Sequence, residues 1–118
     1  MTNSTSSPLP LSEPVFLILL SLASGQKHGY AILKEIESMS GEKLLLSTST
    51  LYGALSRLEN QGYIRRVQAG QPVAPGLPRK VYVITPDGLD LLHGEAERWQ
   101  NLSHIARRYL PKTADQAG

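Results

Sequence analysis

The chain has 118 residues, of which 41% are hydrophobic and none is cysteine. This length supports one compact domain with one further helix, but not two independent domains. Without cysteine the chain has no disulfide framework, thiolate nucleophile or cysteine-based zinc site. The formal net charge of +2 is only mildly basic, so anion binding must depend on where the cations lie rather than on their sum.

Residues 1–11 are rich in Ser, Thr and Pro and lack the basic start of a signal peptide, which predicts a disordered arm. The longest apolar run, residues 15–20, is shorter than the roughly 20 residues that span a bilayer. We therefore expect a soluble, cytoplasmic protein with no membrane partner.

Two short helices are predicted next. The Ser-Glu-Pro sequence at 12–14 is a helix start signal, and Gly25 is a suitable stop after a mostly buried first helix. The second helix is predicted from about His28 to Ser38. Its inward side chains are Ile32, Leu33 and Ile36. The apolar run at 44–46 that follows is compatible with a short strand or a helical turn.

Residues 47–64 contain the central helix of the chain. Leu51, Leu55 and Leu58 recur at helical spacing and form a core-facing stripe. The opposite face carries Ser49, Tyr52, Gly53, Ser56 and Asn60 around Arg57. Small hydroxyl side chains at a helix start let the backbone approach a phosphate or a base edge. The alternative is that the Ser and Thr residues only cap the helix, from Ser47, and that Gly53 relieves a tight helix crossing.

After Gly62 the pattern changes, because residues 63–67 and 80–84 are typical of strands. Residues 69–78 between them hold two Gly and three Pro, which predicts a hairpin with an irregular tip. The cations Arg65, Arg66, Arg79 and Lys80 flank this tip. A cationic hairpin beside a hydroxyl-rich helix favours DNA, with one element in a major groove and the other on the adjacent backbone. The alternative is a solvated edge whose charge prevents strand pairing between molecules.

The last helix is predicted over residues 86–110, with Thr85 as its cap and Pro86 at its first position, followed by a flexible tail at 111–118. Its apolar positions lie on one side: Leu89, Leu92, Ala96, Trp99, Leu102, Ala106 and Tyr109. A helix of about 20 residues is about 30 Å long, more than a domain of this size covers. We therefore expect a homodimer through this helix, with two central helices about 34 Å apart on a duplex. The alternative is a monomer in which the helix folds back on its own subunit.

Three segments resemble the PadR-like transcriptional regulators, a branch of the winged-helix proteins. They are His28-Gly29-Tyr30 with Ile32 and Leu33, the run from Ser47 to Tyr52 with Leu55, Leu58, Glu59 and Gly62, and Lys80-Val81-Tyr82 with Thr85, Gly88 and Leu92. The resemblance covers residues 14–108. It implies a mainly α fold with a small β-hairpin wing: a winged helix-turn-helix domain at 12–85 followed by a long dimerisation helix. It also implies repression of promoters in response to a small molecule.

The resemblance further implies that the N-terminal half of the central helix enters the major groove of double-stranded DNA. With the outward residues of that helix, the candidate DNA contacts are His28, Tyr30, Thr48, Ser49, Thr50, Tyr52, Ser56, Arg57, Arg79 and Lys80. For Tyr30 the alternative is a ring packed on the core, and for His28 a capping or surface role. Thr48 and Ser49 stand where the family often has Pro-Gly, and Gly53 where it usually has Pro, so the operator sequence stays open.

In some relatives an aromatic residue near the position of Trp99 lines a drug-binding cavity between subunits, which makes Trp99 a candidate contact for a small hydrophobic or aromatic effector. The alternative is that Trp99 anchors the dimer interface.

An enzyme is not expected, because the sequence has no triad, carboxylate pair or Gly-rich phosphate loop. The three His lack the spacing of a metal site, and we expect no cofactor. The rival functions are a winged-helix module that binds protein and a small-molecule sensor with secondary DNA binding.

Overall fold

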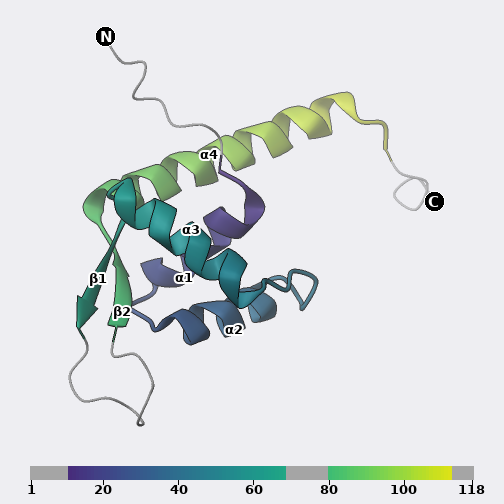
Figure 1. The fold of residues 1–118 in the computed structure, drawn as a ribbon. Coiled ribbons are helices and arrows are strands. Elements are labelled where there is room, and N and C mark those ends of the chain that lie inside the picture. The colour runs from purple at the N-terminus through teal and green to yellow at the C-terminus, as the bar shows by residue number, and fades with distance from the viewer. Residues whose placement is uncertain (1–10, 69–79, 113–118) are drawn as a thin grey trace.

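The computed structural model describes residues 11–68 and 80–112 (Figure 1). The helices and strands follow in the order α1 (Glu13–Ala23), α2 (Gly29–Met39), α3 (Thr48–Asn60), β1 (Ile64–Gln68), β2 (Lys80–Ile84) and α4 (Pro86–Tyr109). The predicted fold class, mainly helical with a small hairpin and a long last helix, is confirmed. The predictions for residues 1–10, for the hairpin tip and for the tail from residue 113 lie outside the described residues.

The core lies where α1, α2 and α3 pack together and the hairpin closes one end. Its fully buried apolar side chains are Ile18, Leu19, Leu22, Ile32, Ile36, Leu51, Leu55 and Ile64. Burying one such side chain stabilises the fold by about 1.5–3 kcal/mol. The inward faces predicted for the helices are confirmed, because helical periodicity alone decides which positions can reach the core.

Side chains cap three of the helices at their N-termini, as the sequence predicts. The hydroxyl of Ser12 accepts from the Val15 amide at 3.3 Å, that of Ser47 from the Thr50 amide at 3.1 Å, and that of Thr85 from the Gly88 amide at 3.1 Å. Each such cap satisfies an N–H that has no partner within its helix and contributes about 1 kcal/mol. The caps therefore fix where α1, α3 and α4 begin.

The hairpin is antiparallel, with Ile64 opposite Ile84 and Gln68 opposite Lys80. A third segment pairs with it: the amide and carbonyl of Lys27 bond to the carbonyl and amide of Tyr82 at 3.2 and 2.8 Å. The sequence did not indicate this bridge, because a single paired residue between two helices has no periodicity. The bridge ties the linker before α2 to the base of the wing.

One prediction and one alternative from the sequence do not hold in the region between α2 and β1. Residues 44–46 form neither a strand nor a helical turn, because the chain reverses just before them, with positive φ at Gly41 (64°) and Glu42 (66°). Gly53 does not relieve a helix crossing, since a Cβ at this position would meet only the Arg57 guanidinium at 3.7 Å. The outer side of α3 at Gly53 is therefore open.

Helix α4 is 24 residues long; its first half packs on the domain and its second half is exposed to solvent. Its first half packs on α1 and β2, and Leu92 is buried in the core of its own subunit. Leu92 was expected in the dimer interface; this is wrong, because α1 already covers that part of the stripe. From Gln100 to Leu110 every residue is exposed, and this half projects beyond the domain (Figure 1). None of the described helices is long and apolar enough to cross a membrane.

Candidate nucleic-acid interface

The first turn of α3 presents a row of hydroxyls to solvent. Residues 47–50 are all exposed, and the Ser47 hydroxyl donates to Thr50 Oγ1 at 2.8 Å. This side-chain bond and the cap together hold the turn in one conformation. Further along the same helix Tyr52, Ser56 and Arg57 are exposed as well. The face opposite the core is therefore compact, polar and accessible to a base edge or a phosphate.

The start of α2 lies against this helix through Gly29 and Tyr52. A Cβ at Gly29 would overlap the Tyr52 hydroxyl, so the glycine permits the two helices to approach closely. The Tyr52 ring is 40% exposed and lies partly on the outer face and partly between the helices. Tyr30 is 68% exposed, and the Lys34 ammonium lies 5.9 Å from the centre of its ring. The alternative that Tyr30 packs on the core is therefore excluded.

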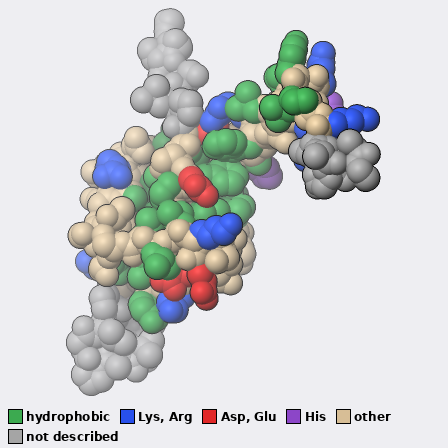
Figure 2. Space-filling view, turned by 90° about the vertical axis from the view of Figure 1, so that its right-hand side faces the viewer, with side chains coloured by type: hydrophobic (Ala, Val, Ile, Leu, Met, Phe, Trp, Pro, Cys, Tyr) green, Lys and Arg blue, Asp and Glu red, His purple; other side chains and the backbone are tan. Residues whose placement is uncertain are grey.

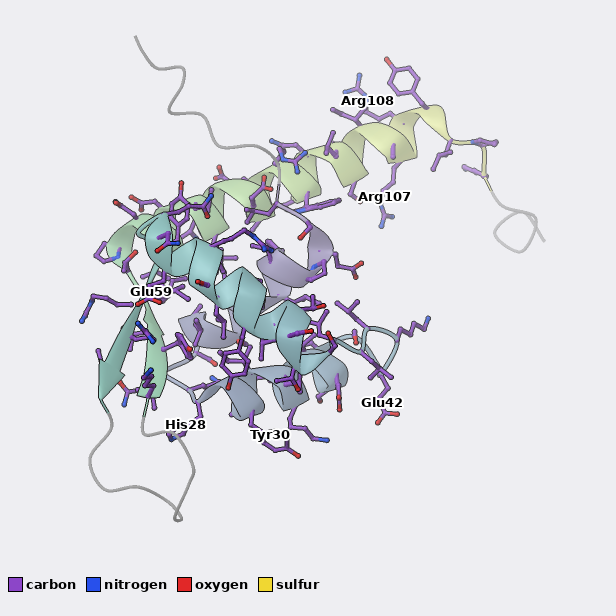
Figure 3. All side chains as sticks on the ribbon, viewed as in Figure 1. His28, Tyr30, Glu42, Glu59, Arg107 and Arg108 are labelled. Atoms are coloured by element: carbon purple, nitrogen blue, oxygen red, sulfur yellow. The ribbon has the colours of Figure 1, made fainter. Side chains whose placement is uncertain are left out.

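His28 connects α2 to the wing. Its Nδ1 lies 3.1 Å from the main-chain carbonyl oxygen of Lys80, the first residue of β2. Figure 3 shows His28 and Tyr30 on the same lower edge of the molecule, both directed away from the core. His28 is the N-cap residue of α2 but makes no side-chain cap bond. Its imidazole is therefore held by the wing rather than by its own helix.

The hairpin cations are not equivalent. Arg66 Nε lies 2.9 Å from the Glu59 carboxylate at the end of α3, so an acidic partner already offsets its charge. Arg65 and Lys80 are exposed. The candidate contact Arg79 lies outside the described residues. No local sequence pattern indicates the Glu59–Arg66 pair, because the two residues lie on different elements.

The structure separates the candidate effector residue from the candidate DNA contacts. Trp99 lies on α4, and none of the candidate DNA contacts belongs to that helix. It lines a groove of about 420 Å³ together with Glu13, Phe16 and Leu17 of α1. The Arg98 guanidinium lies over the indole, 5.2 Å from its centre. Within residues 11–68 and 80–112, no three His, Asp or Glu side chains group as a possible metal site.

Two cations near the candidate DNA-binding surface of α2 and α3 were not predicted from the sequence. Lys34 follows Tyr30 by four residues, a spacing that places the two side chains together on a helix and that could have indicated the pair. The Lys27 ammonium is directed inward instead: it donates to the Ser21 carbonyl at 2.7 Å and pairs with Glu35 at 3.2 Å. Lys34 is therefore a further candidate contact on this surface, whereas the ammonium of Lys27 is bound to Ser21 and Glu35 within the domain.

A helix with an accessible polar face, a preceding helix packed across a tight turn and a following hairpin with exposed cations define a winged helix-turn-helix protein. The model of the transcriptional regulator PadR-like family matches residues 18–94. The chain therefore belongs to this family of transcriptional regulators.

Solved structures and one curated sequence are similar to this chain. A transcriptional regulator from Clostridium thermocellum is 28% identical, with a TM-score of 0.70 over 86% of this chain and 99% of that one. A PadR family regulator from Clostridium difficile is 25% identical, with a TM-score of 0.70 over 85% and 100%. An uncharacterized 37.1 kDa protein in transposon TN4556 of Streptomyces fradiae is 39% identical over 92 residues, which are 78% of this chain. The match covers only 24% of that relative's length.

Proposed function

We propose that the protein is a transcriptional repressor that binds a pseudo-palindromic operator as a homodimer and is released by a small hydrophobic or aromatic effector. One observation carries this proposal: α3, whose first turn is exposed, contacts the start of α2 where Tyr52 meets Gly29, and the adjacent His28 lies 3.1 Å from the Lys80 carbonyl of the wing. Residues 12–85 then act as the DNA-binding domain and 86–110 as the dimerisation helix.

On this surface the hydroxyls of Thr48, Ser49 and Thr50, with Tyr52, Ser56 and Arg57, face the bases and the adjacent phosphates. A lost base contact costs about 1–3 kcal/mol in discrimination. Tyr30, His28 and Lys80 lie at the edge of the surface and contact the backbone, and Arg79 is proposed as a further backbone contact. Each phosphate that a cation neutralises lowers log affinity by about 0.9 per log unit of salt.

The dimer forms through the exposed half of α4. Leu102, Ile105 and Tyr109 are 45%, 47% and 79% exposed, and Ala96, Trp99 and Ala106 extend the same side. Leu89, at the other end of the helix, is 36% exposed. Figure 2 shows hydrophobic side chains gathered on the domain beside α4 and again near the end of that helix. A second copy that covers this side removes its apolar surface from water and places the two α3 helices on one face of a duplex.

The groove beside Trp99 suits the proposed effector. Its volume of about 420 Å³ lies within the range of about 300–1,000 Å³ that small-molecule sites occupy. Phe16, Leu17 and the indole supply apolar contacts. Because the groove lies between α1 and the half of α4 proposed to dimerise, a molecule bound there alters how two subunits pack. The competing role for Trp99 is a plain interface anchor, in which case no molecule binds.

The test compares binding of a specific and a scrambled duplex across a salt series. Lys80→Ala should lower the salt slope by about 0.9 per subunit and leave the base preference intact, whereas Ser49→Ala should change the base preference. Arg107→Ala is the matched control, because it removes a cation from the far end of α4 (Figure 3). Equal, weak binding to both duplexes would favour the winged-helix protein-interaction module instead.

A further inference from the structure

We infer that His28 is a proton-linked contact to the DNA backbone, so that protonation of its imidazole tightens DNA binding. This inference rests on the proposed function and adds a form of regulation to it. It follows from the hydrogen bond between His28 and the wing, together with the number of N–H donors that a neutral or a protonated imidazole carries.

The partner of His28 fixes the position of its proton. Nδ1 lies 3.1 Å from the Lys80 carbonyl oxygen, and a main-chain carbonyl can only accept. Nδ1 must therefore donate. A neutral imidazole carries one N–H, so Nε2 then holds a lone pair and has no hydrogen to offer a phosphate oxygen. Only the imidazolium donates from Nδ1 to the wing and from Nε2 to an anion at the same time.

The ring is placed to use that second donor. His28 is half-buried, and its side chain is directed outward beside Tyr30 on the edge between α2 and the wing (Figure 3). In the proposed complex this edge faces the phosphates next to the groove that α3 enters. A charge-assisted hydrogen bond from imidazolium to phosphate is stronger than a neutral one. The neutral ring instead presents its lone pair to an anion.

The carboxylates around His28 are not available to pair with its imidazolium. The carboxylates on the neighbouring elements are already paired: Glu35 with Lys27 at 3.2 Å, Glu37 with Lys34 at 3.3 Å and Glu59 with Arg66 at 2.9 Å. The other titratable side chains on these elements include no carboxylate: they are Tyr30 on α2, Tyr52 and Arg57 on α3, and Arg65, Lys80 and Tyr82 on the hairpin. An imidazolium at His28 therefore gains its anionic partner when a phosphate arrives.

The sign of the effect follows from linkage. If the bound phosphate favours the charged ring, DNA binding takes up a proton, and affinity must rise as pH falls through the range in which imidazole titrates, pH 5–8. We expect binding about 3–10-fold tighter at pH 6 than at pH 8, per His28 engaged.

The experiment measures Kd for one duplex at pH 6, 7 and 8 and constant ionic strength. His28→Gln should remove the pH dependence, so that its Kd is the same at pH 6 and at pH 8. His28→Asn, a good N-cap residue that can still donate to the Lys80 carbonyl, should behave in the same way, which separates lost protonation from a damaged α2 start. His93→Gln and His104→Gln are controls on α4 and should keep the wild-type profile.

Two outcomes would overturn the inference while leaving the proposed function in place. One is tight wild-type binding that does not change with pH, and the other is an unaltered pH profile in both His28 variants. A wild-type protein that binds no duplex at any of the three pH values would overturn the proposed function, and this inference with it.

Discussion

Gly88 and Gly94 lie six residues apart on α4 and have opposite surroundings. Gly88 is buried, and a Cβ there would overlap the main-chain carbonyl oxygen of Tyr63 and the side chain of Ile84. At Gly94 an added Cβ meets nothing within 4 Å. The first turn of α4 thus lies directly on the segment that leads into β1, and a side chain at position 88 would separate the two.

Gly88→Ala should lower the free energy of unfolding by about 1–3 kcal/mol, because a backbone oxygen cannot move aside as a side chain can. Gly94→Ala should be neutral or stabilise by up to about 1 kcal/mol, since alanine favours a helix interior. Denaturant unfolding of both variants measures the difference. A Gly88→Ala variant as stable as Gly94→Ala would show that the close approach to Tyr63 is absent in solution.

Glu95 is the buried acid of α4. Its carboxylate accepts from Arg98 Nε at 2.6 Å and from the main-chain amide of Leu11 at 2.6 Å, which joins the chain before α1 to α4. The Arg98 guanidinium and then the Leu11 amide hold the pKa of Glu95 below its ordinary value of 4.5, against the opposing effect of burial. The ionised carboxylate therefore stabilises the folded chain.

Because the pKa of Glu95 is lower in the folded chain than in the unfolded chain, ionised Glu95 stabilises the fold at pH values above the unfolded pKa, near 4.5. This stabilisation is lost as pH falls through the lower pKa of the folded state. Glu95→Gln should therefore be less stable than wild type at pH 7, and the gap should close as pH falls below 4.5. Thermal unfolding from pH 7 to pH 3 measures this. Glu97→Gln, an exposed neighbour, should show no such gap. A gap that stays constant with pH would contradict the assigned role of the charge.

At the scale of elements, the wing is positioned from two sides. Lys27 bridges β2 at Tyr82, and Glu59 at the end of α3 pairs with Arg66 of β1. The Glu59 carboxylate also offsets the charge of Arg66, a cation that the proposed function would otherwise make available to a phosphate. The exposed pair is weak in itself, because water screens it. Its effect should therefore appear in DNA binding rather than in stability.

Glu59→Gln should raise the salt slope of DNA binding by up to about 0.9 per subunit, because Arg66 becomes available to a phosphate. The apparent affinity at low salt should rise with it. Glu97→Gln makes the same change in net charge on α4 and should leave the slope unchanged. If both variants shift the slope equally, net charge is responsible and Arg66 plays no separate part.

Local features of the chain could be predicted from the sequence, and contacts between distant residues could not. The helix starts at Ser12, Ser47 and Thr85 and the core-facing stripes follow from caps and periodicity within a single element. The bond from His28 to Lys80 spans 52 positions and has no local signal. The site residues on α3 could thus be proposed from the sequence, whereas the long-range contacts that position the neighbouring elements could not.

At the scale of the whole molecule, α4 serves two purposes. Its first half closes the core through Leu92, and the exposed half carries Leu102, Ile105 and Tyr109 beyond the domain. Periodicity predicted one continuous apolar stripe, but it could not show where α1 stops covering it. The molecule extends 58 Å along its longest axis, and the uncovered half of α4 is the part available to a second copy.

Leu102→Glu should shift the dimer toward monomer, because it places a carboxylate within the proposed apolar contact. Gln100→Glu adds the same charge on the opposite side of the exposed half and should leave the assembly intact. Mass measured by sedimentation at matched concentrations distinguishes the two variants. Equal masses for both would contradict the assignment of this side of α4 to the interface.

Sequence-specific binding by a dimer is tested by letting the purified protein select bound sequences from a pool of random DNA duplexes, with the mass of the complex measured in the same buffer. A homodimeric repressor should enrich a pseudo-palindromic motif whose half-sites lie about one helical turn, about 34 Å, apart, and should bind it as two chains per duplex. Recovery of an unenriched pool would contradict sequence-specific DNA recognition, and a single chain on each selected duplex would contradict the dimer.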